Sequence, residues 1–288
     1  MPVDISFKVR PMLPDDLDHV LNLSKKEGWN QTEKDWRLLI ENPLNTCLVV
    51  ENIKRIIGTA TALSHSNKVA WIGMVLVDKD FRGRGAGKIL MTHLLEKLQR
   101  FKSIKLDATP AGQPLYAKLG FVDEHIIYRM TNPSMKKLYY DKRDQGIRPM
   151  LSEHFREMIK FDEQIFGVDR KYLLENLFRN YPDKAFMMDR NNKFCGYTLG
   201  RDGTRFNYIG PVFASSPDDA KKLLSEALKS LINLPVALDV LEDKRELIMW
   251  LESIGFIKQR HFVRMYLKSN PYPGIVKNQY LISGPEFG

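Results

Sequence analysis

An internal repeat constrains this chain more than any other feature of its sequence. The tetrapeptide "RPML" occurs at residues 10–13 and again at 148–151, an offset of 138. A second pattern, Gly-Phe followed after seven residues by Arg-Met, begins at Gly120 and again at Gly255, an offset of 135. Patterns in the same order at a nearly constant offset indicate two copies of one fold.

The repeat divides the chain into four parts. The first copy spans residues 1–135, a polar linker spans 136–145, the second copy spans 146–269, and a tail spans 270–288. A length of 288 residues suits two domains of this size. We expect either a monomer that acts as an internal pseudo-dimer or a homodimer of such chains.

Apolar patterning alternates between strand and helix in each copy. In the first copy, "TCLVVEN", "RIIGTATAL" and "VAWIGMVLV" have the composition of strands, and the last is apolar enough to be buried on both faces. From Gly87 onward, leucines and other apolar residues recur at helical spacing. This predicts a mixed α/β fold in which each copy has a central, mostly antiparallel sheet flanked by helices.

Composition narrows the class of protein. No apolar run approaches the ~18 residues of a membrane span, and two cysteines are too few for a disulfide framework or a metal site. We therefore expect a cytoplasmic protein without a resident metal or a membrane partner. The formal charge of +9 suggests an anionic ligand, but the basic residues are scattered and no nucleic-acid-binding motif accompanies them.

A glycine-rich loop, "RGRGAG" at residues 82–87, follows the apolar strand and precedes a helix. Glycines allow the backbone to approach a ligand closely, and the exposed N–H groups of a helix N-terminus favour phosphate. The loop fits neither the P-loop nor the G-x-G-x-x-G dinucleotide pattern, because Arg82 and Lys88 stand where those motifs need glycine. It fits the pattern Arg/Gln-x-x-Gly-x-Gly/Ala through Arg82, Gly85 and Gly87.

Together with "LYAKLGF" at residues 115–121, this loop resembles the GNAT family of acetyl-coenzyme A-dependent N-acetyltransferases. The resemblance covers the whole first copy and implies that acetyl-CoA is the co-substrate. It implies that the loop binds the pyrophosphate and that the end of the preceding strand binds the pantetheine arm. The implied coenzyme-binding residues are Val75, Leu76, Val77, Arg82, Gly83, Arg84, Gly85, Ala86, Gly87 and Lys88.

The resemblance also implies a catalytic role for Tyr116, which would protonate the departing thiolate. Packing inside a short helix is the alternative. Aligned on Gly-Phe, the second copy has Leu251 at this position, and it also lacks the glycine loop. The second copy is therefore interpreted as degenerate, and the joint loss supports a role for Tyr116 at the coenzyme.

The general base and the acceptor pocket are less well defined. Many family members carry a glutamate where this chain has Trp71, and Asp107 has a counterpart in Asp239 of the copy without a loop, which suggests a structural role. Asp78, Glu51, His65 and a water relay remain candidates for the base. Trp29 and Trp36, between the first two helices, are candidates for the acceptor pocket, with core packing as the alternative for both.

The sequence thus predicts transfer of acetyl from acetyl-CoA to a primary amine, by direct attack in a ternary complex. A small-molecule acceptor is favoured. The alternatives are a protein or peptide N-acetyltransferase and a non-catalytic CoA-binding sensor or interaction module.

Overall fold

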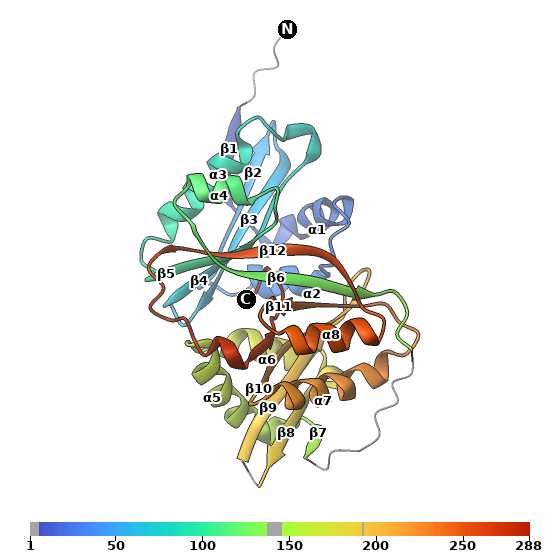
Figure 1. Ribbon diagram of the computed structural model, residues 1–288. Helices are drawn as coiled ribbons and strands as arrows, with labels where there is room; N and C mark the ends of the chain where they lie inside the picture. The colour runs from blue at the N-terminus through green and yellow to red at the C-terminus, as the bar shows by residue number, and fades with distance from the viewer. Residues whose placement is uncertain (1–5, 137–145, 192) are drawn as a thin grey trace.

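The computed structural model describes residues 6–136, 146–191 and 193–288, so the predicted linker lies almost entirely outside the described residues. The two copies form the upper and lower halves of the molecule in Figure 1, and the C-terminal residue lies between them. The mixed α/β fold with a mostly antiparallel sheet is confirmed.

The first copy contains six strands and four α-helices within the described residues. Its strands are β1 (Phe7–Pro11), β2 (Thr46–Asn52), β3 (Arg55–His65), β4 (Val69–Val77), β5 (Ser103–Ala108) and β6 (Val122–Asn132). Its helices are α1 (Leu17–Lys26), α2 (Glu33–Ile40), α3 (Ala86–Lys97) and α4 (Gln113–Lys118).

The second copy repeats this order of elements. Its strands are β7 (Ile147–Pro149), β8 (Phe186–Arg190), β9 (Lys193–Arg201), β10 (Asn207–Ala214), β11 (Val236–Leu241) and β12 (Ile257–Lys268). Its helices are α5 (Phe155–Phe166), α6 (Lys171–Asn180), α7 (Pro217–Leu228) and α8 (Arg245–Ser253). The tail adds one short strand, β13 (Gln279–Leu281). Six 3-10 turns lie between these elements, at Pro14–Asp16, Lys79–Phe81, Ser152–His154, Pro182–Lys184, Lys229–Leu231 and Val276–Asn278.

Local sequence explains where several of these helices begin. Thr32 and Asp35 form a capping box at the start of α2, in which Asp35 accepts from the Thr32 backbone N–H at 2.7 Å. Ser216 caps α7 by accepting from the N–H of Asp219. The start of α3 has no side-chain cap, since Gly85 occupies the N-cap position.

The two copies exchange their last strands and share one sheet. The described residues form a 13-stranded sheet of order β1-β2-β3-β4-β5-β12-β6-β11-β13-β10-β9-β8-β7. Strand β12 of the second copy pairs with β5 of the first, and β6 of the first copy pairs with β11 of the second. The sequence predicted a separate sheet in each copy. It did not reveal the exchange, because the strand patterns carry no information about which copy supplies the partner.

Reciprocal ion pairs hold the exchanged strands. Arg264 on β12 makes a bidentate pair with Asp107 on β5, at 2.9 and 3.0 Å. Arg129 on β6 makes the equivalent pair with Asp239 on β11, at 2.8 and 2.6 Å. The repeated Arg-Met dipeptide thus supplies the two arginines that join the copies.

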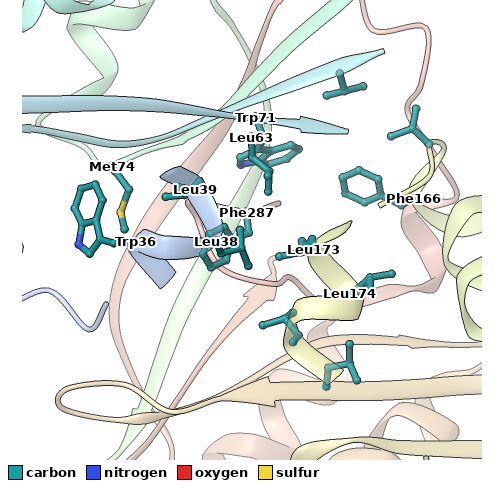
Figure 2. Close-up of a cluster of buried hydrophobic side chains, with 14 of the residues drawn as sticks. Trp36, Leu38, Leu39, Leu63, Trp71, Met74, Phe166, Leu173, Leu174 and Phe287 are labelled. Atoms are coloured by element: carbon teal, nitrogen blue, oxygen red, sulfur yellow. The ribbon is translucent and has the colours of Figure 1, made fainter. Parts of the chain in front are cut away.

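A single hydrophobic cluster also spans both copies (Figure 2). Trp36 and Trp71 of the first copy lie in the same cluster as Phe166 and Leu173 of the second, together with Phe287 of the tail. Trp36 and Phe287 are fully buried. Because burial of apolar area is the main stabilising contribution to folding, the two copies and the tail form one structural unit.

Candidate acetyl-transfer site

A cavity of about 120 Å³ lies between the two copies. It opens where β4 and β5 separate, and its walls come from both copies and from the tail. Its lining residues are Trp29, Asn30, Gln31, Ile72, Gly73, Met74, Val75, Leu106, Asp107, Thr109, Tyr116, Arg129, Arg260, Phe262, Pro285 and Glu286.

The separation of β4 from β5 begins at Ile72. The two strands pair in parallel only from Val69 to Ile72. Directly after this, Met74 adopts a positive φ of 50°, which a side chain of this size rarely adopts. The hydroxyl of Thr59 on β3 donates to the Met74 carbonyl at 2.7 Å, and this bond fixes the irregularity. The edge of β4 that faces away from β3 is therefore left open toward a ligand.

The glycine loop lies between β4 and α3 and fits a phosphate group. A Cβ added at Gly83 or Gly85 would meet no atom within 4 Å, so the space in front of the backbone is open. Gly85 has a φ of 89°, which disfavours any side chain there. The first turn of α3 has no acidic residue and no side-chain cap. Its N–H groups are thus available for a coenzyme pyrophosphate.

Two loop cations already have partners. The Arg82 guanidinium donates to the Val77 carbonyl at 2.9 Å and pairs with Glu27 at 2.7 Å. Arg84 lies over the Phe81 ring at 5.8 Å from its centroid. Arg82 therefore braces the loop against the end of β4, and part of its charge is already compensated. The other predicted coenzyme residues, from Val75 to Val77 and from Ala86 to Lys88, lie at the end of β4 and the start of α3.

Tyr116 lies on α4 and lines the cavity. Its ring packs edge-on against Phe121, with 6.0 Å between ring centroids. Its hydroxyl has no hydrogen-bond partner among the described residues. Burial raises the pKa of this hydroxyl, so it remains protonated at neutral pH. The geometry therefore offers a free proton donor inside the cavity.

The two predicted tryptophans are placed differently. Trp29 lines the cavity. Trp36 does not: its side chain is fully buried in the hydrophobic cluster, and its indole N–H donates to the Ser24 hydroxyl at 3.3 Å. Trp36 lies on the apolar face of α2, and for this residue the core-packing alternative describes its position.

The segment beside Trp29 is held by a turn of the second copy. The Asn30 side-chain oxygen accepts from the backbone N–H groups of Arg205 and Phe206 at 3.0 and 2.9 Å. Its amide donates to the Phe206 carbonyl at 3.0 Å, and the Thr204 hydroxyl donates to the Trp29 carbonyl at 3.0 Å. The second copy thus positions one wall of a cavity that belongs mainly to the first.

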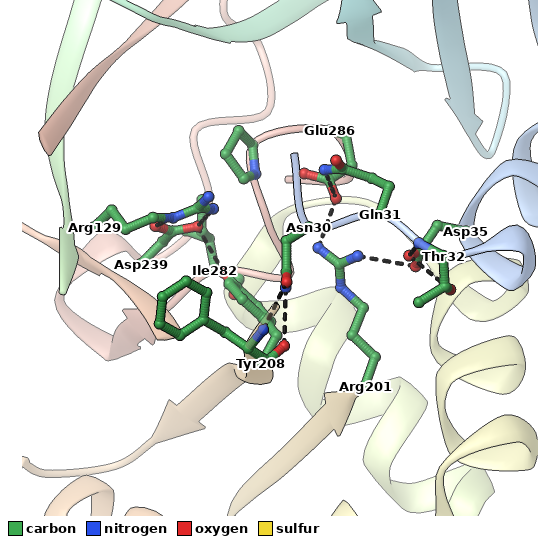
Figure 3. A network of polar contacts seen from close by, with 12 residues as sticks. Asn30, Gln31, Thr32, Asp35, Arg129, Arg201, Tyr208, Asp239, Ile282 and Glu286 are labelled. Atoms are coloured by element: carbon green, nitrogen blue, oxygen red, sulfur yellow. Dashed lines mark hydrogen bonds and ion pairs between the residues drawn. The ribbon is translucent and has the colours of Figure 1, made fainter. Parts of the chain in front are cut away.

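The tail brings a carboxylate to the cavity (Figure 3). Glu286 accepts from Gln31 at 2.9 Å and pairs with Arg201 at 2.6 Å. Arg201 also contacts Asp35 at 2.9 Å. Burial by itself raises the pKa of Glu286, but the charge of Arg201, the hydrogen bond from Gln31 and the charge of Arg129 together outweigh this effect, and the net pKa is lowered. Glu286 is therefore a fixed anion and a poor proton acceptor at neutral pH.

The candidate bases from the sequence lie elsewhere or are engaged. Asp78 pairs with Arg55, and Glu51 pairs with Arg10. His65 is buried against the Phe287 carbonyl, and its burial together with the charge of Arg170 lowers its pKa to about 3. None of these three candidates lines the cavity.

Asp107 and Trp71 are both held by contacts with other parts of the chain. Asp107 does line the cavity, but its carboxylate accepts hydrogen bonds from Nε and Nη2 of Arg264. Trp71, at the place of the family glutamate, donates from its indole N–H to the Pro285 carbonyl at 3.0 Å. It therefore anchors the tail.

The corresponding place in the second copy is filled. Strand β13 of the tail lies between β10 and β11, pairing with Val212 on one and Val240 on the other. At the N-terminus of α7, Asp219 and the Ser216 hydroxyl occupy the position that an anion would take. The second copy thus has neither an open strand edge nor a free helix N-terminus for a coenzyme.

Several cavity residues were not predicted from the sequence. Gln31, Arg129, Arg260, Phe262 and Glu286 come from four different segments, and local patterns gave no sign that these segments meet. Among the described residues, no group of three or more His, Cys, Asp or Glu side chains could hold a metal ion, and no helix is long and apolar enough to cross a membrane.

Known families account for both copies. Residues 15–121 match the model described as the acetyltransferase (GNAT) family, and residues 158–281 match an acetyltransferase (GNAT) domain. The chain therefore belongs to the GNAT acetyltransferases and carries two GNAT domains in tandem. It is an acyltransferase of a family that uses acetyl-CoA, as the sequence predicted.

Two sequence relatives extend over most of the chain. The uncharacterized N-acetyltransferase YitH of Bacillus subtilis is 25% identical over 83% of this chain and 84% of its own length. A holothin acyltransferase of a Pseudoalteromonas species is 26% identical over 75% of this chain and 72% of its own length.

Solved structures share the fold. A putative acetyltransferase from Pyrococcus horikoshii covers 98% of this chain and 96% of its own, with a TM-score of 0.81 and 24% identity. A tandem GNAT protein from the clavulanic acid biosynthesis pathway covers 91% of this chain and 98% of its own, with a TM-score of 0.62 and 14% identity.

Proposed function

We propose that the first copy transfers acetyl from acetyl-CoA to the primary amine of a small molecule, by direct attack in a ternary complex. The observation that carries this proposal is the cavity at the separation of β4 and β5, which is lined by the open strand edge and Tyr116, while the glycine loop follows the end of β4. Neither Cys47 nor Cys195 lines the cavity, which disfavours a covalent acetyl-enzyme.

The size and walls of the cavity favour a small acceptor over a polypeptide. A volume of about 120 Å³ is below the ~300–1,000 Å³ that is typical of ligand pockets. The tail residues Pro285 and Glu286 contribute to the lining, and so do Arg260 and Phe262 of the exchanged strand β12. A protein or peptide N-acetyltransferase, the first alternative, would need an open groove here. The similarity to a holothin acyltransferase gives further support to a small acceptor.

The residues of this chain have separate parts in the proposed reaction. Acetyl-CoA supplies the thioester when bound at the glycine loop. Backbone N–H groups of the open β4 edge, around Leu76 and Val77, would donate to the developing oxyanion. The Tyr116 hydroxyl would donate its proton to the leaving thiolate. Burial makes a thiolate in the same groove more basic, just as it raises the pKa of the tyrosine, so the proton transfer remains well matched.

Removal of the amine proton is assigned to water rather than to a carboxylate. Asp107 is held by Arg264 and the pKa of Glu286 is lowered by Arg201, so neither serves as the base. An alkyl ammonium has a pKa of roughly 10 in water. The acceptor therefore has to bind as the minor neutral form or lose its proton to a water in the cavity.

A CoA-release assay over a panel of primary amines tests this function. Wild-type protein should release CoA with at least one small amine. Tyr116→Phe should lower kcat by ~10²-fold or more while leaving acetyl-CoA affinity unchanged, because the phenyl ring keeps the packing against Phe121 and removes only the proton donor. CoA binding without turnover of any amine would instead favour the sensor alternative. Turnover with peptides alone would favour the protein acetyltransferase.

A further inference from the structure

Arg260 is a cavity residue that the proposed mechanism does not use. It lies on the exchanged strand β12 of the second copy and lines the cavity of the first. Its guanidinium lies over the Phe262 ring at 5.0 Å from the centroid, and Phe262 lines the same cavity. An aromatic face of this kind restrains the direction of the guanidinium without neutralising its charge.

The other arginines around the cavity are paired with carboxylates. Arg129 pairs with Asp239 and Arg264 pairs with Asp107, each through two nitrogens. Arg201 contacts both Glu286 and Asp35. Among the residues that the structure describes, none provides a carboxylate within ion-pair distance of Arg260. Its cationic charge is thus the one at this cavity without a direct protein counter-ion.

Arg260 lies beside a second arginine in the sheet. It lies directly opposite Arg129 in the antiparallel pairing of β12 with β6. Like charges opposite one another across a pair of strands are destabilising. Burial and the charge of Arg129 both lower the pKa of Arg260, and the charges of Asp239 and Glu286 offset part of this effect. An anion bound in the cavity would relieve both effects.

Gln31, a second cavity residue, has a hydrogen-bond acceptor without a partner. Gln31 is only 7% exposed, and its side-chain oxygen is buried without a hydrogen-bond partner. Its amide nitrogen donates to Glu286 at 2.9 Å, and its oxygen is not exposed to the cavity in this structure, so a ligand reaches this acceptor only after the side chain turns. A buried acceptor without a partner costs ~1–3 kcal/mol, and an N–H group of a ligand would satisfy it.

We propose that the acceptor carries an anionic group of the carboxylate class besides its amine, and that Arg260 of the second copy binds this group. The amine is the group that the proposed reaction acetylates, so the substrate class is a small amino acid or a similar amino-carboxylate. This inference rests on the proposed function of the cavity. It gives the second copy a part in substrate selection, although β13 lies between β10 and β11 of that copy, where a coenzyme would bind.

The coenzyme phosphates are a less suitable partner for Arg260. No residue of the loop from Arg82 to Lys88 lines this cavity. The phosphate-binding N-terminus of α3 and the guanidinium of Arg260 therefore belong to separate regions of the site.

Matched pairs of amines test the proposal. CoA release is measured with glycine, β-alanine and 4-aminobutyrate. Each acid is compared with its primary amide, in which an uncharged group of nearly the same shape replaces the carboxylate. We expect kcat/KM to favour at least one acid over its amide by ~10–100-fold. Arg260→Gln should abolish this preference by lowering kcat/KM for the acid and leave acetyl-CoA affinity unchanged. Lys258→Gln, which removes an exposed charge from the same strand, is the control and should retain the preference.

A binding measurement distinguishes this inference from the proposed function. Calorimetric titration with N-acetyl-β-alanine and N-acetyl-β-alaninamide needs no turnover, and the acid should bind more tightly in wild type but not in Arg260→Gln. Arg260-dependent binding of the acid without acetylation of any amine would support the anion site and contradict the proposed function. Equal use and equal binding of acids and amides, or no binding of any acid, would overturn the inference.

Discussion

Arg201 connects more of the molecule than any other single residue near the site. It is fully buried on β9 of the second copy and contacts Asp35 of the first copy and Glu286 of the tail. Removal of the guanidinium would leave two buried carboxylates without a cation. Loss of one partner from a buried ion pair typically costs ~3–5 kcal/mol.

Arg201→Gln is expected to lower the free energy of unfolding by at least ~3 kcal/mol in urea denaturation. The matched control is Arg179→Gln, which removes an exposed helical pair with Glu175 and should change stability by less than ~0.5 kcal/mol. Equal effects of the two substitutions would contradict the assignment of Arg201 as the ion-pair centre between the copies.

The pKa shift of Tyr116 predicts the pH dependence of the reaction. Its pKa is raised above the usual value of 10.0 by burial, so the protonated form that donates persists to higher pH than in a free tyrosine. The neutral acceptor amine, in contrast, becomes more abundant as pH rises. We therefore expect kcat/KM to rise about tenfold per pH unit up to the amine pKa, with no decline below pH ~10. A declining limb near pH 8–9 that is absent in Tyr116→Phe would contradict this account.

At the scale of elements, the turn at residues 202–206 holds the segment at residues 28–31 against the cavity. The hydrogen bonds of Asn30 to Arg205 and Phe206 require close approach of the turn. Gly203 permits it, because a Cβ there would lie 2.1 Å from the Asn30 side-chain nitrogen and 2.4 Å from the Phe206 carbonyl oxygen. The acceptor wall of the first copy is thus shaped by a turn of the second.

Gly203→Ala is expected to displace Asn30 and raise the acceptor KM by ~10-fold or more, with acetyl-CoA affinity unchanged. Steady-state kinetics and coenzyme titration measure the two effects. Thr204→Ser, which keeps the hydroxyl that donates to Trp29, should behave as wild type. A Gly203→Ala protein with unchanged acceptor KM would show that the turn does not position the acceptor wall.

The elements differ in how far the sequence could predict them. The β4–loop–α3 unit follows from local chemistry, because an apolar strand, glycines and helix periodicity follow one another between Val69 and Lys97. Tyr116 was singled out by comparing the two copies. Glu286 and Arg260 could not be found in this way. Their contacts with Gln31 and Arg129 join segments more than a hundred residues apart, and nothing in the tail "SGPEFG" indicates where it lies.

At the scale of the whole molecule, the two copies differ at equivalent places: β4 and β5 separate beside an open cavity, whereas β13 lies between β10 and β11. The exchange of β6 and β12 places residues of each copy in the other, with Arg264–Asp107 and Arg129–Asp239 as equivalent joints. The tail then breaks the symmetry. Its strand β13 fills the gap between β10 and β11, and its end reaches Trp71 and the open cavity of the first copy.

Calorimetric titration of the full chain with acetyl-CoA tests the central claim, a single coenzyme site in the first copy, most directly. The account predicts one site per chain. It also predicts loss of binding in Gly85→Glu, where a side chain and a negative charge enter the phosphate position, and unchanged binding in Ser216→Ala at the start of α7. A stoichiometry of two, or loss of binding on the change at Ser216 but not at Gly85, would contradict it.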